Sequence, residues 1–245
     1  MKRSLVIPAL AAAALLSLRA APAAGADQAP FMPLEVGRYW EYAGISGAHQ
    51  VETITGTRTI LGRTVFVKSY AEGLDAGLQN FWLTGPDGEV LLAGFDTATH
   101  DLALAYDPPI TFCGGAPSLG DVWITHVTVY NIADLSLFDT FDIAYSALEL
   151  PMLSVPAGAF DCVGVGQVLV GPSPARVRLA GRTVALDGRQ LVGAQDALST
   201  NATDWFAWGV GVVQYVTSDT YQLVGYGMPT AALRGSWGAL KALYR

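Results

Sequence analysis

Short runs of β-branched and aromatic residues, each interrupted by turn residues, constrain the fold of this sequence more than any other feature. Asp121–Asn131 is one such run, and the runs recur roughly every 10 residues. Gly85-Pro86-Asp87-Gly88 is the clearest tight-turn signal, because proline presets φ and glycine tolerates a positive φ. Since no helical segments alternate with these runs, the sequence predicts an antiparallel all-β domain.

The expected strands cover most of the chain after residue 36. They are Gly37–Ala43, Gln50–Thr55, Thr64–Tyr70, Asn80–Thr84, Glu89–Gly94, Asp121–Asn131, Phe138–Ala147, Phe160–Val170, two short arms in Arg176–Leu186, Asp204–Thr217 and Thr220–Gly227. We expect a helix or a loop at Gln190–Ser199, and a helix at Ser236–Arg245 that Ser236 caps. The predicted fold is a curved antiparallel sheet or half-barrel with a short C-terminal helix.

The N-terminus has the pattern of a secretory signal peptide. Lys2 and Arg3 precede the apolar stretch Leu5–Leu18, and small residues suitable for cleavage follow at 21–26. As a helix the apolar stretch would span about 21 Å, which is short of the roughly 30 Å of a bilayer core. An uncleaved anchor is the alternative. We expect a signal peptide at 1–26, a β domain at 27–235 and an amphipathic tail at 236–245, with no transmembrane segment in the mature chain.

Charge and compartment limit the partners of the chain. It has 14 Lys and Arg against 21 Asp and Glu, a formal net charge of −7, which argues against a nucleic-acid binder. The expected location is the periplasm or the extracellular space. In such an oxidising compartment Cys113 and Cys162 are expected to form a disulfide, which would add about 4 kcal/mol of stability. Two separate buried thiols are the alternative.

The histidines and glycines form no recognisable catalytic, metal or cofactor motif. His49, His100 and His126 lack a second ligand at metal spacing. No Gly-x-Ser-x-Gly elbow and no dinucleotide-binding glycine pattern is found in the sequence. We therefore expect no catalytic residue, no metal and no cofactor.

Acidic residues form the single cluster that could carry acid–base chemistry. Asp134, Asp139 and Asp142 lie close in sequence, and Glu149 follows them. Their spacing matches no calcium loop, and Asp139 and Asp142 would lie on opposite faces of a strand. Solvated acids are the preferred interpretation, and an acid-dependent hydrolase is the alternative.

Six tryptophans in a chain with little predicted helix are the remaining signal. They either fill a large β core or line a concave sheet that holds an apolar ligand. Trp205 and Trp208 are three residues apart and would point to opposite faces of a regular strand. We expect Trp205 and Trp208, together with Trp237 in the tail, to form a surface for a ligand or a partner.

Three segments resemble a group of secreted or envelope bacterial β-proteins of unassigned function. Phe31–Tyr42 resembles their Pro-Leu-x-x-Gly-x-x-Trp-x-Tyr segment, Val155–Cys162 their Val-Pro-Ala-Gly-x-Phe segment, and Trp205–Val213 their Gly-Val-Gly segment. The resemblance implies a half-barrel similar to lipoprotein carriers and implies no catalytic residue. The tail Ser236–Arg245 resembles the ending of some exported bacterial proteins, which implies a sorting or docking role.

Three functions follow from these observations as hypotheses. The first is an exported, non-enzymatic envelope protein that binds an apolar or lipid-like small molecule, or another envelope protein. The second is a structural or interaction module with the C-terminal tail as its docking segment. The third is an acid-dependent hydrolase.

Overall fold

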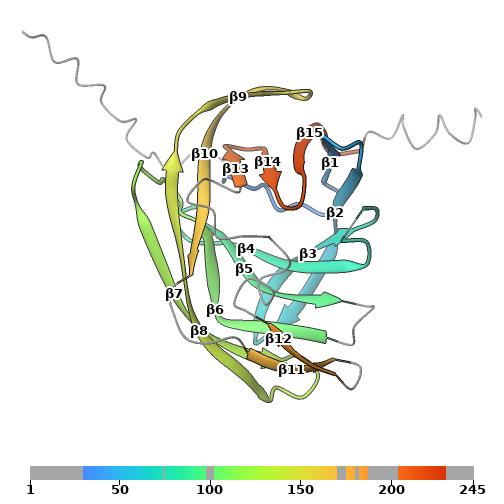
Figure 1. The fold of residues 1–245 in the computed structure, drawn as a ribbon, viewed down its shortest axis with the longest axis vertical. Helices are drawn as coiled ribbons and strands as arrows, with labels where there is room; N and C mark the ends of the chain where they lie inside the picture. Colours follow the sequence, from blue (N-terminus) through green and yellow to red (C-terminus); the bar gives the residue numbers. More distant parts are fainter. Residues whose placement is uncertain are drawn as a thin grey trace, which may run out of the picture.

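The protein folds into antiparallel β-strands that surround a common interior (Figure 1). This computed structural model describes residues 30–73, 75–97, 102–169, 175–179, 182–186 and 204–229. Within those ranges no residue is helical. The expected all-β antiparallel class is therefore confirmed. The signal peptide, the segment Gln190–Ser199 and the tail at 236–245 lie outside the described residues.

The strands follow the chain in a simple order. They are β1 (Tyr39–Gly44), β2 (His49–Ile60), β3 (Arg63–Tyr70), β4 (Leu78–Thr84), β5 (Val90–Thr97), β6 (Leu102–Cys113), β7 (Val122–Asn131), β8 (Leu137–Glu149), β9 (Met152–Val155), β10 (Gly158–Leu169), β11 (Ala175–Leu179), β12 (Arg182–Leu186), β13 (Asp204–Ala207), β14 (Gly211–Val216) and β15 (Thr220–Gly227).

The main sheet closes on itself and forms a barrel of 12 strands. Its order is β13-β14-β15-β1-β2-β3-β4-β5-β6-β7-β8-β10, and β10 pairs again with β13, from Cys162 opposite Ala207 to Val165 opposite Asp204. The expected half-barrel is therefore not confirmed, because this last ladder satisfies the edges that an open sheet would leave unpaired. Strand β9 extends the sheet beyond the ring, and β11 and β12 form a separate hairpin.

Turn chemistry explains two tight hairpins of the barrel. Between β4 and β5 the Gly85 N–H donates to the Glu89 carbonyl at 2.9 Å, which closes the Gly-Pro-Asp-Gly turn. Between β2 and β3, Leu61 and Gly62 both have positive φ values, of 47° and 76°. This pair of left-handed residues reverses the chain within two residues, as in the favoured two-residue hairpin loops.

Strand β6 is absent from the sequence-based expectation because it contains Pro108 and Pro109. The pairing shows how the strand accommodates them. Ile110 pairs with Leu92 of β5, and the next pair in that ladder is Ala105 with Gly94, so the prolines lie in an irregular stretch. On the other side, β7 pairs with β6 only as far as Asp107. Neither proline therefore needs to supply a backbone N–H to a ladder.

Large aromatic side chains fill the interior of the barrel. Trp40, Tyr42, Tyr106, Tyr145, Tyr221, Phe31 and Phe206 are among the largest fully buried side chains. The Trp40 indole N–H donates to the Val210 carbonyl at 2.5 Å, which links β1 to the turn after β13. Phe206 lies edge-on to Phe112 at 5.9 Å and so joins β13 to β6 across the interior. These contacts stabilise the closed arrangement by removing aromatic surface from water.

A smaller apolar cluster lies on the opposite face of β2–β6. Its buried members are Ile60, Val65, Val67, Phe81, Ala93 and Ala105. These residues alternate along the strands with interior side chains, so they belong to the outer face. The Arg58 guanidinium lies 5.5 Å from the centre of the Phe81 ring on that face. The sheet is therefore apolar on both faces over part of its width.

The predicted disulfide is wrong: Cys113 and Cys162 are both free and buried. Cys113 ends β6 and Cys162 lies in β10, with β7 and β8 between them. Strands three positions apart are separated by about 14 Å along a sheet, whereas a disulfide requires Cα atoms within about 7 Å. Burial raises the pKa of both thiols, to about 11 for Cys162. The alternative of two separate buried thiols is the observed arrangement.

Gly94 provides a test of the packing between β5 and β6. It has a φ of +146°, and a Cβ at this position would lie 2.1 Å from the Leu104 carbonyl oxygen. We expect Gly94→Ala to lower the free energy of unfolding in urea by about 2 kcal/mol or more, because the backbone of β6 must move. Gly56→Ala is the control, since a Cβ there meets nothing within 4 Å. Equal stabilities of the two variants would contradict the described approach of β5 and β6.

Candidate functional site

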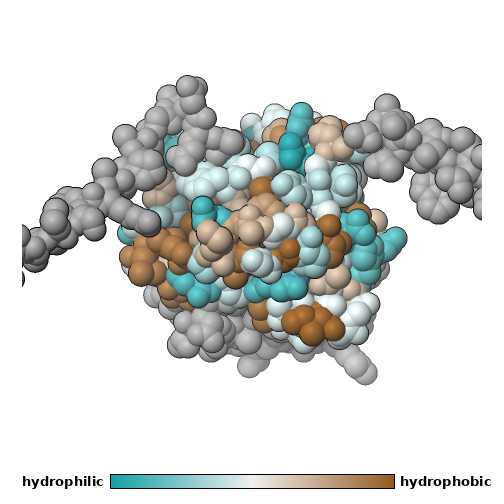
Figure 2. Space-filling model, turned by 90° about the horizontal axis from the view of Figure 1, so that it is seen from above, coloured by the Kyte–Doolittle hydropathy of each residue, from teal (hydrophilic) through white to brown (hydrophobic). Residues whose placement is uncertain are grey.

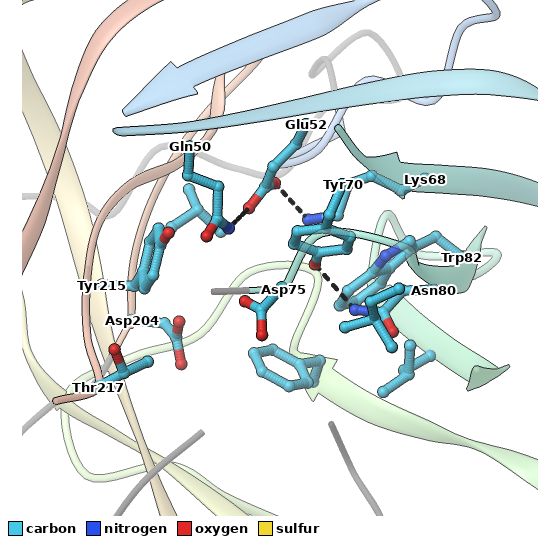
Figure 3. A pocket seen from close by; sticks show the side chains of 14 residues that line it. Gln50, Glu52, Lys68, Tyr70, Asp75, Asn80, Trp82, Asp204, Tyr215 and Thr217 are labelled. Atoms are coloured by element: carbon cyan, nitrogen blue, oxygen red, sulfur yellow. Dashed lines mark hydrogen bonds and ion pairs between the residues drawn. The ribbon is translucent and has the colours of Figure 1, made fainter. Parts of the chain in front are cut away.

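A small cavity lies inside one end of the barrel, among polar and aromatic side chains (Figure 3). It has about 40 Å³ of space for the centres of water molecules, which is room for roughly three waters. Its lining comes mainly from the start of β2, the end of β3, the start of β4 and the strands β13 and β14: Gln50, Glu52, Lys68, Tyr70, Asp75, Leu78, Asn80, Trp82, Leu92, Phe112, Asp204, Val212, Tyr215 and Thr217. The cavity therefore belongs to the barrel end that carries the β3–β4 and β14–β15 connections.

Strand register brings the polar lining together. In β2 and β3, Glu52 pairs with Tyr70 and Ile54 pairs with Lys68, so Glu52 and Lys68 are diagonal neighbours on one face. In β3 and β4, Lys68 pairs with Asn80, which extends the same face by one strand. The bulge between Ile54 and Gly56 changes the register of β2 beyond this point.

A buried ion pair is the centre of this arrangement. The Lys68 ammonium lies 2.7 Å from Glu52 Oε2, and each side chain is only 5% exposed. The Gln50 amide donates to the other Glu52 oxygen at 3.0 Å (Figure 3). Both carboxylate oxygens are thus hydrogen-bonded, which compensates part of the cost of removing the charges from water.

Aromatic rings surround the same ammonium. Lys68 Nζ lies 5.1 Å from the centre of a Trp82 ring, 5.2 Å from Tyr70 and 6.0 Å from Trp40. These distances allow cation–π attraction at a buried site. The Tyr70 hydroxyl accepts a hydrogen bond of 2.8 Å from the Asn80 amide. This end of the barrel is therefore built to hold a positive charge.

Two further carboxylates, Asp75 and Asp204, line the cavity. Desolvation raises the pKa of Asp75, and the charge of Glu52 raises it further; Lys68 and a hydrogen bond from Gln50 act in the opposite direction. Asp204 also contributes a negative field, because its charge raises the pKa of Tyr145 and Tyr215, whose pKa values rise mainly through burial. The described lining carries three carboxylates and one ammonium.

Several buried polar atoms around the cavity have no hydrogen-bond partner in the part of the chain that the structure describes. They are Asn80 Oδ1, the Trp82 indole N–H and the Tyr215 hydroxyl. These side chains are only 6%, 5% and 5% exposed. Because unsatisfied buried polar groups are costly, these three groups make the cavity a place where a polar partner would be stabilised.

The tryptophans that the sequence singled out lie away from this cavity. Trp205 is buried in β13, and its indole N–H donates to Glu149 Oε1 at 2.6 Å. Trp208 lies in the turn after β13, where its ring stacks on Phe31 at 3.6 Å. The alternation of a regular strand therefore does not extend to Trp208. Trp237 lies outside the described residues.

The acids Asp134, Asp139 and Asp142 do not form a site. Asp134 accepts hydrogen bonds from the backbone and side chain of Ser136, which lower its pKa. Asp142 contacts His126 Nδ1 across β7 and β8 on the exposed side of the sheet. Glu149, the fourth acid of that group, contacts Trp205 as described above. Within the described ranges, no three His, Cys, Asp or Glu side chains are grouped so that they could hold a metal ion.

His49 connects the loop that carries Asp75 to the barrel. Its Nε2 lies 2.8 Å from Glu41 Oε1 in β1, and its Nδ1 lies 3.0 Å from Glu72 Oε2 in the β3–β4 connection. Hydrogen bonds to Glu41 and then to Glu72 raise the pKa of His49, against a small opposing effect of desolvation. Protonated His49 can donate to both carboxylates, so the contact strengthens as the pH falls through the pKa of His49.

Sequence analysis found none of the cavity residues. The usual expectation for a strand is that polar residues face solvent, so Gln50, Glu52 and Lys68 gave the pattern of an exposed face. The one available signal was the mixed character of one strand face: in Thr64–Tyr70, Lys68 shares its face with Phe66 and Tyr70, which are large aromatics. A lysine on an aromatic face indicates a paired or enclosed charge.

Removal of one partner of the buried ion pair tests its energetics. We expect Glu52→Gln to lower the free energy of unfolding by about 3–5 kcal/mol, because it leaves the Lys68 charge buried without its carboxylate. In chemical denaturation, the double variant Glu52→Leu with Lys68→Met is expected to lose less stability than the sum of the losses in Glu52→Leu and Lys68→Met alone. Additive losses would show that the two groups do not interact.

The titration of His49 tests the connection to the loop. We expect its pKa, measured by NMR, to lie above 6.5 and to fall in Glu41→Gln. Because the folded-state pKa is raised, the stabilisation is fully present below about pH 6.5 and is lost as the pH rises through the folded-state value. Asp139→Asn, which alters a distant carboxylate, should leave the titration unchanged. An unshifted His49 would contradict the two contacts.

In the described ranges, no helix has the length and apolarity needed to cross a membrane. Comparison with known proteins gives no match: neither a protein-family model, nor a curated protein, nor a solved structure is similar to this chain. The resemblance of Phe31–Tyr42, Val155–Cys162 and Trp205–Val213 to secreted bacterial β-proteins therefore stays a prediction.

Proposed function

We propose that this chain is an exported, non-enzymatic binding protein that holds a small polar ligand in the cavity at the end of its barrel. The observation that carries the proposal is the set of unpartnered polar atoms around one cavity: Asn80 Oδ1, the Trp82 N–H and the Tyr215 hydroxyl. Together they offer an acceptor, a donor and a hydroxyl that does both. A ligand that satisfied all three would recover the cost of leaving them buried.

The lining favours a polar ligand over the lipid-like ligand expected from the tryptophans. Drug-sized or acyl-chain ligands occupy pockets of about 300–1,000 Å³, whereas this cavity holds roughly three waters. The deeper interior is occupied by aromatic side chains such as Trp40 and Phe206, both almost fully buried. An apolar ligand would leave the unpartnered polar atoms of Asn80, Trp82 and Tyr215 unsatisfied.

The hydrolase alternative has one observation in its favour, the raised pKa of Asp75 beside the negative charge of Glu52. Paired carboxylates with different pKa values are typical of acid–base catalysis. However, Lys68 holds Glu52 at 2.7 Å and Gln50 occupies its other oxygen, so Glu52 does not present a free base. Binding is therefore the better-supported function.

The interaction-module alternative depends on a docking tail, at 236–245, that lies outside the described residues. On the described surface, large apolar side chains such as Ile124 and Met152 are exposed, by 62% and 72%. Figure 2 shows hydrophobic areas at the end of the molecule near β9, divided by hydrophilic side chains. Scattered apolar residues of this kind are normal on a protein surface.

Native mass spectrometry of the protein purified gently from its own host tests the proposal. We expect a small adduct that is released on denaturation. Its occupancy should fall at least about tenfold in Trp82→Phe and Tyr215→Phe, because each variant removes one hydrogen-bonding group from the cavity.

Tyr226→Phe is the matched control, because Tyr226 is exposed and does not line the cavity. Its adduct should match that of the wild-type protein. An adduct that is the same in all variants would place the ligand elsewhere, and a wild-type protein that carries and takes up no small molecule would refute the function.

A further inference from the structure

We propose that the ligand of this cavity is a small organic cation with a primary ammonium group, which binds between Asp75 and the unpartnered acceptors Asn80 Oδ1 and the Tyr215 hydroxyl. This inference rests on the proposed function and specifies its ligand. It follows from the charge of the lining, from the unused acceptors, from the aromatic walls and from the size of the cavity.

The charge of the described lining is negative. Lys68 neutralises Glu52 at 2.7 Å, and Asp75 is a further carboxylate on the same cavity. Desolvation and the field of Glu52 already disfavour the charged form of Asp75, as its raised pKa indicates. A cation beside Asp75 would relieve this repulsion, whereas an anion would increase it.

The hydrogen-bonding groups favour an ammonium that carries N–H donors. Asn80 Oδ1 is an acceptor, and the Tyr215 hydroxyl can accept as well as donate. Figure 3 shows Asp75 between these two side chains, with Tyr215 on one side and Asn80 on the other. A primary ammonium has three N–H donors, so beside Asp75 it can use the carboxylate and still donate toward a neutral acceptor of the lining.

The chain itself shows that this environment accepts an ammonium. Lys68 places one against Glu52, with Trp82 and Tyr70 at 5.1 and 5.2 Å. The walls of the cavity are built from the same side chains and from Phe112, so a second ammonium would meet aromatic surface of the same kind. The lining therefore offers a second ammonium the same kinds of group that surround Lys68, a carboxylate and aromatic rings.

The space available limits the rest of the molecule. Room for roughly three waters corresponds to a cation of about four non-hydrogen atoms. Asp75 and Thr217 are partly exposed at the barrel end, whereas Asn80 and Tyr215 are buried. The ammonium would therefore enter past Asp75 and Thr217, with any longer substituent toward that end.

Calorimetric titration with 2-aminoethanol at neutral pH tests the inference. Ethylene glycol is the matched probe, because it has the same number of heavy atoms and no charge. We expect 2-aminoethanol to bind at least about tenfold more tightly than ethylene glycol, as a charge-assisted hydrogen bond requires. Asp75→Asn should weaken its binding by about tenfold, and Tyr215→Phe should weaken it several-fold.

Asp87→Asn is the control, because Asp87 is an exposed carboxylate in the β4–β5 turn, outside the cavity lining. Circular dichroism tests whether each variant is folded. If Asp75→Asn does not fold, the binding of 2-aminoethanol to Tyr215→Phe tests the cation assignment. Equal binding of the two probes, absence of 2-aminoethanol binding, or indifference to both cavity variants would overturn the cation assignment. The native-mass adduct reports separately on the proposed function: if it persists and depends on Trp82, the cavity binds a ligand of another class.

Discussion

Closure of a sheet by the ladder between β10 and β13 sets the size of the interior, and that size governs the rest of the structure. Eight strands leave an interior just wide enough for side chains, and the diameter grows with strand number. A ring of 12 strands therefore has to be filled with unusually large side chains. Trp40, Tyr145 and Phe206 meet this need in the apolar part, and the long side chain of Lys68 does so at the polar end.

At the polar end, hydrogen bonds of suitable geometry offset the cost of burying the charges. A buried ion pair is stabilising only when hydrogen bonds satisfy its remaining atoms, and Glu52 meets that condition through Lys68 and Gln50. The same low-polarity surroundings make Asp75 sensitive to any further charge, since its pKa is already raised by desolvation. The ion pair and the cavity thus form one electrostatic unit, in which the carboxylates outnumber the ammonium.

Local features of the fold could be predicted from the sequence, and long-range pairings could not. The Gly85–Gly88 turn and the hairpin of β2 and β3 follow from residues close in sequence, so they were predictable. The pairing of Cys162 with Ala207 joins segments 45 residues apart, and no pattern in either strand specifies it. The same limit applies to the site: Glu52 and Lys68 lie in two different expected strands, and alternation within each strand shows neither that they share a face nor that this face is enclosed.

The ring also determines what the molecule exposes to its neighbours. Within the main sheet, β9 is the one strand outside the closed ring, and it has only four residues. Its hairpin with β10 leans against the barrel, where the Ala157 N–H donates to the Leu223 carbonyl at 3.0 Å and Phe160 contacts Tyr226. A template for strand-by-strand polymerisation is therefore almost absent from this sheet.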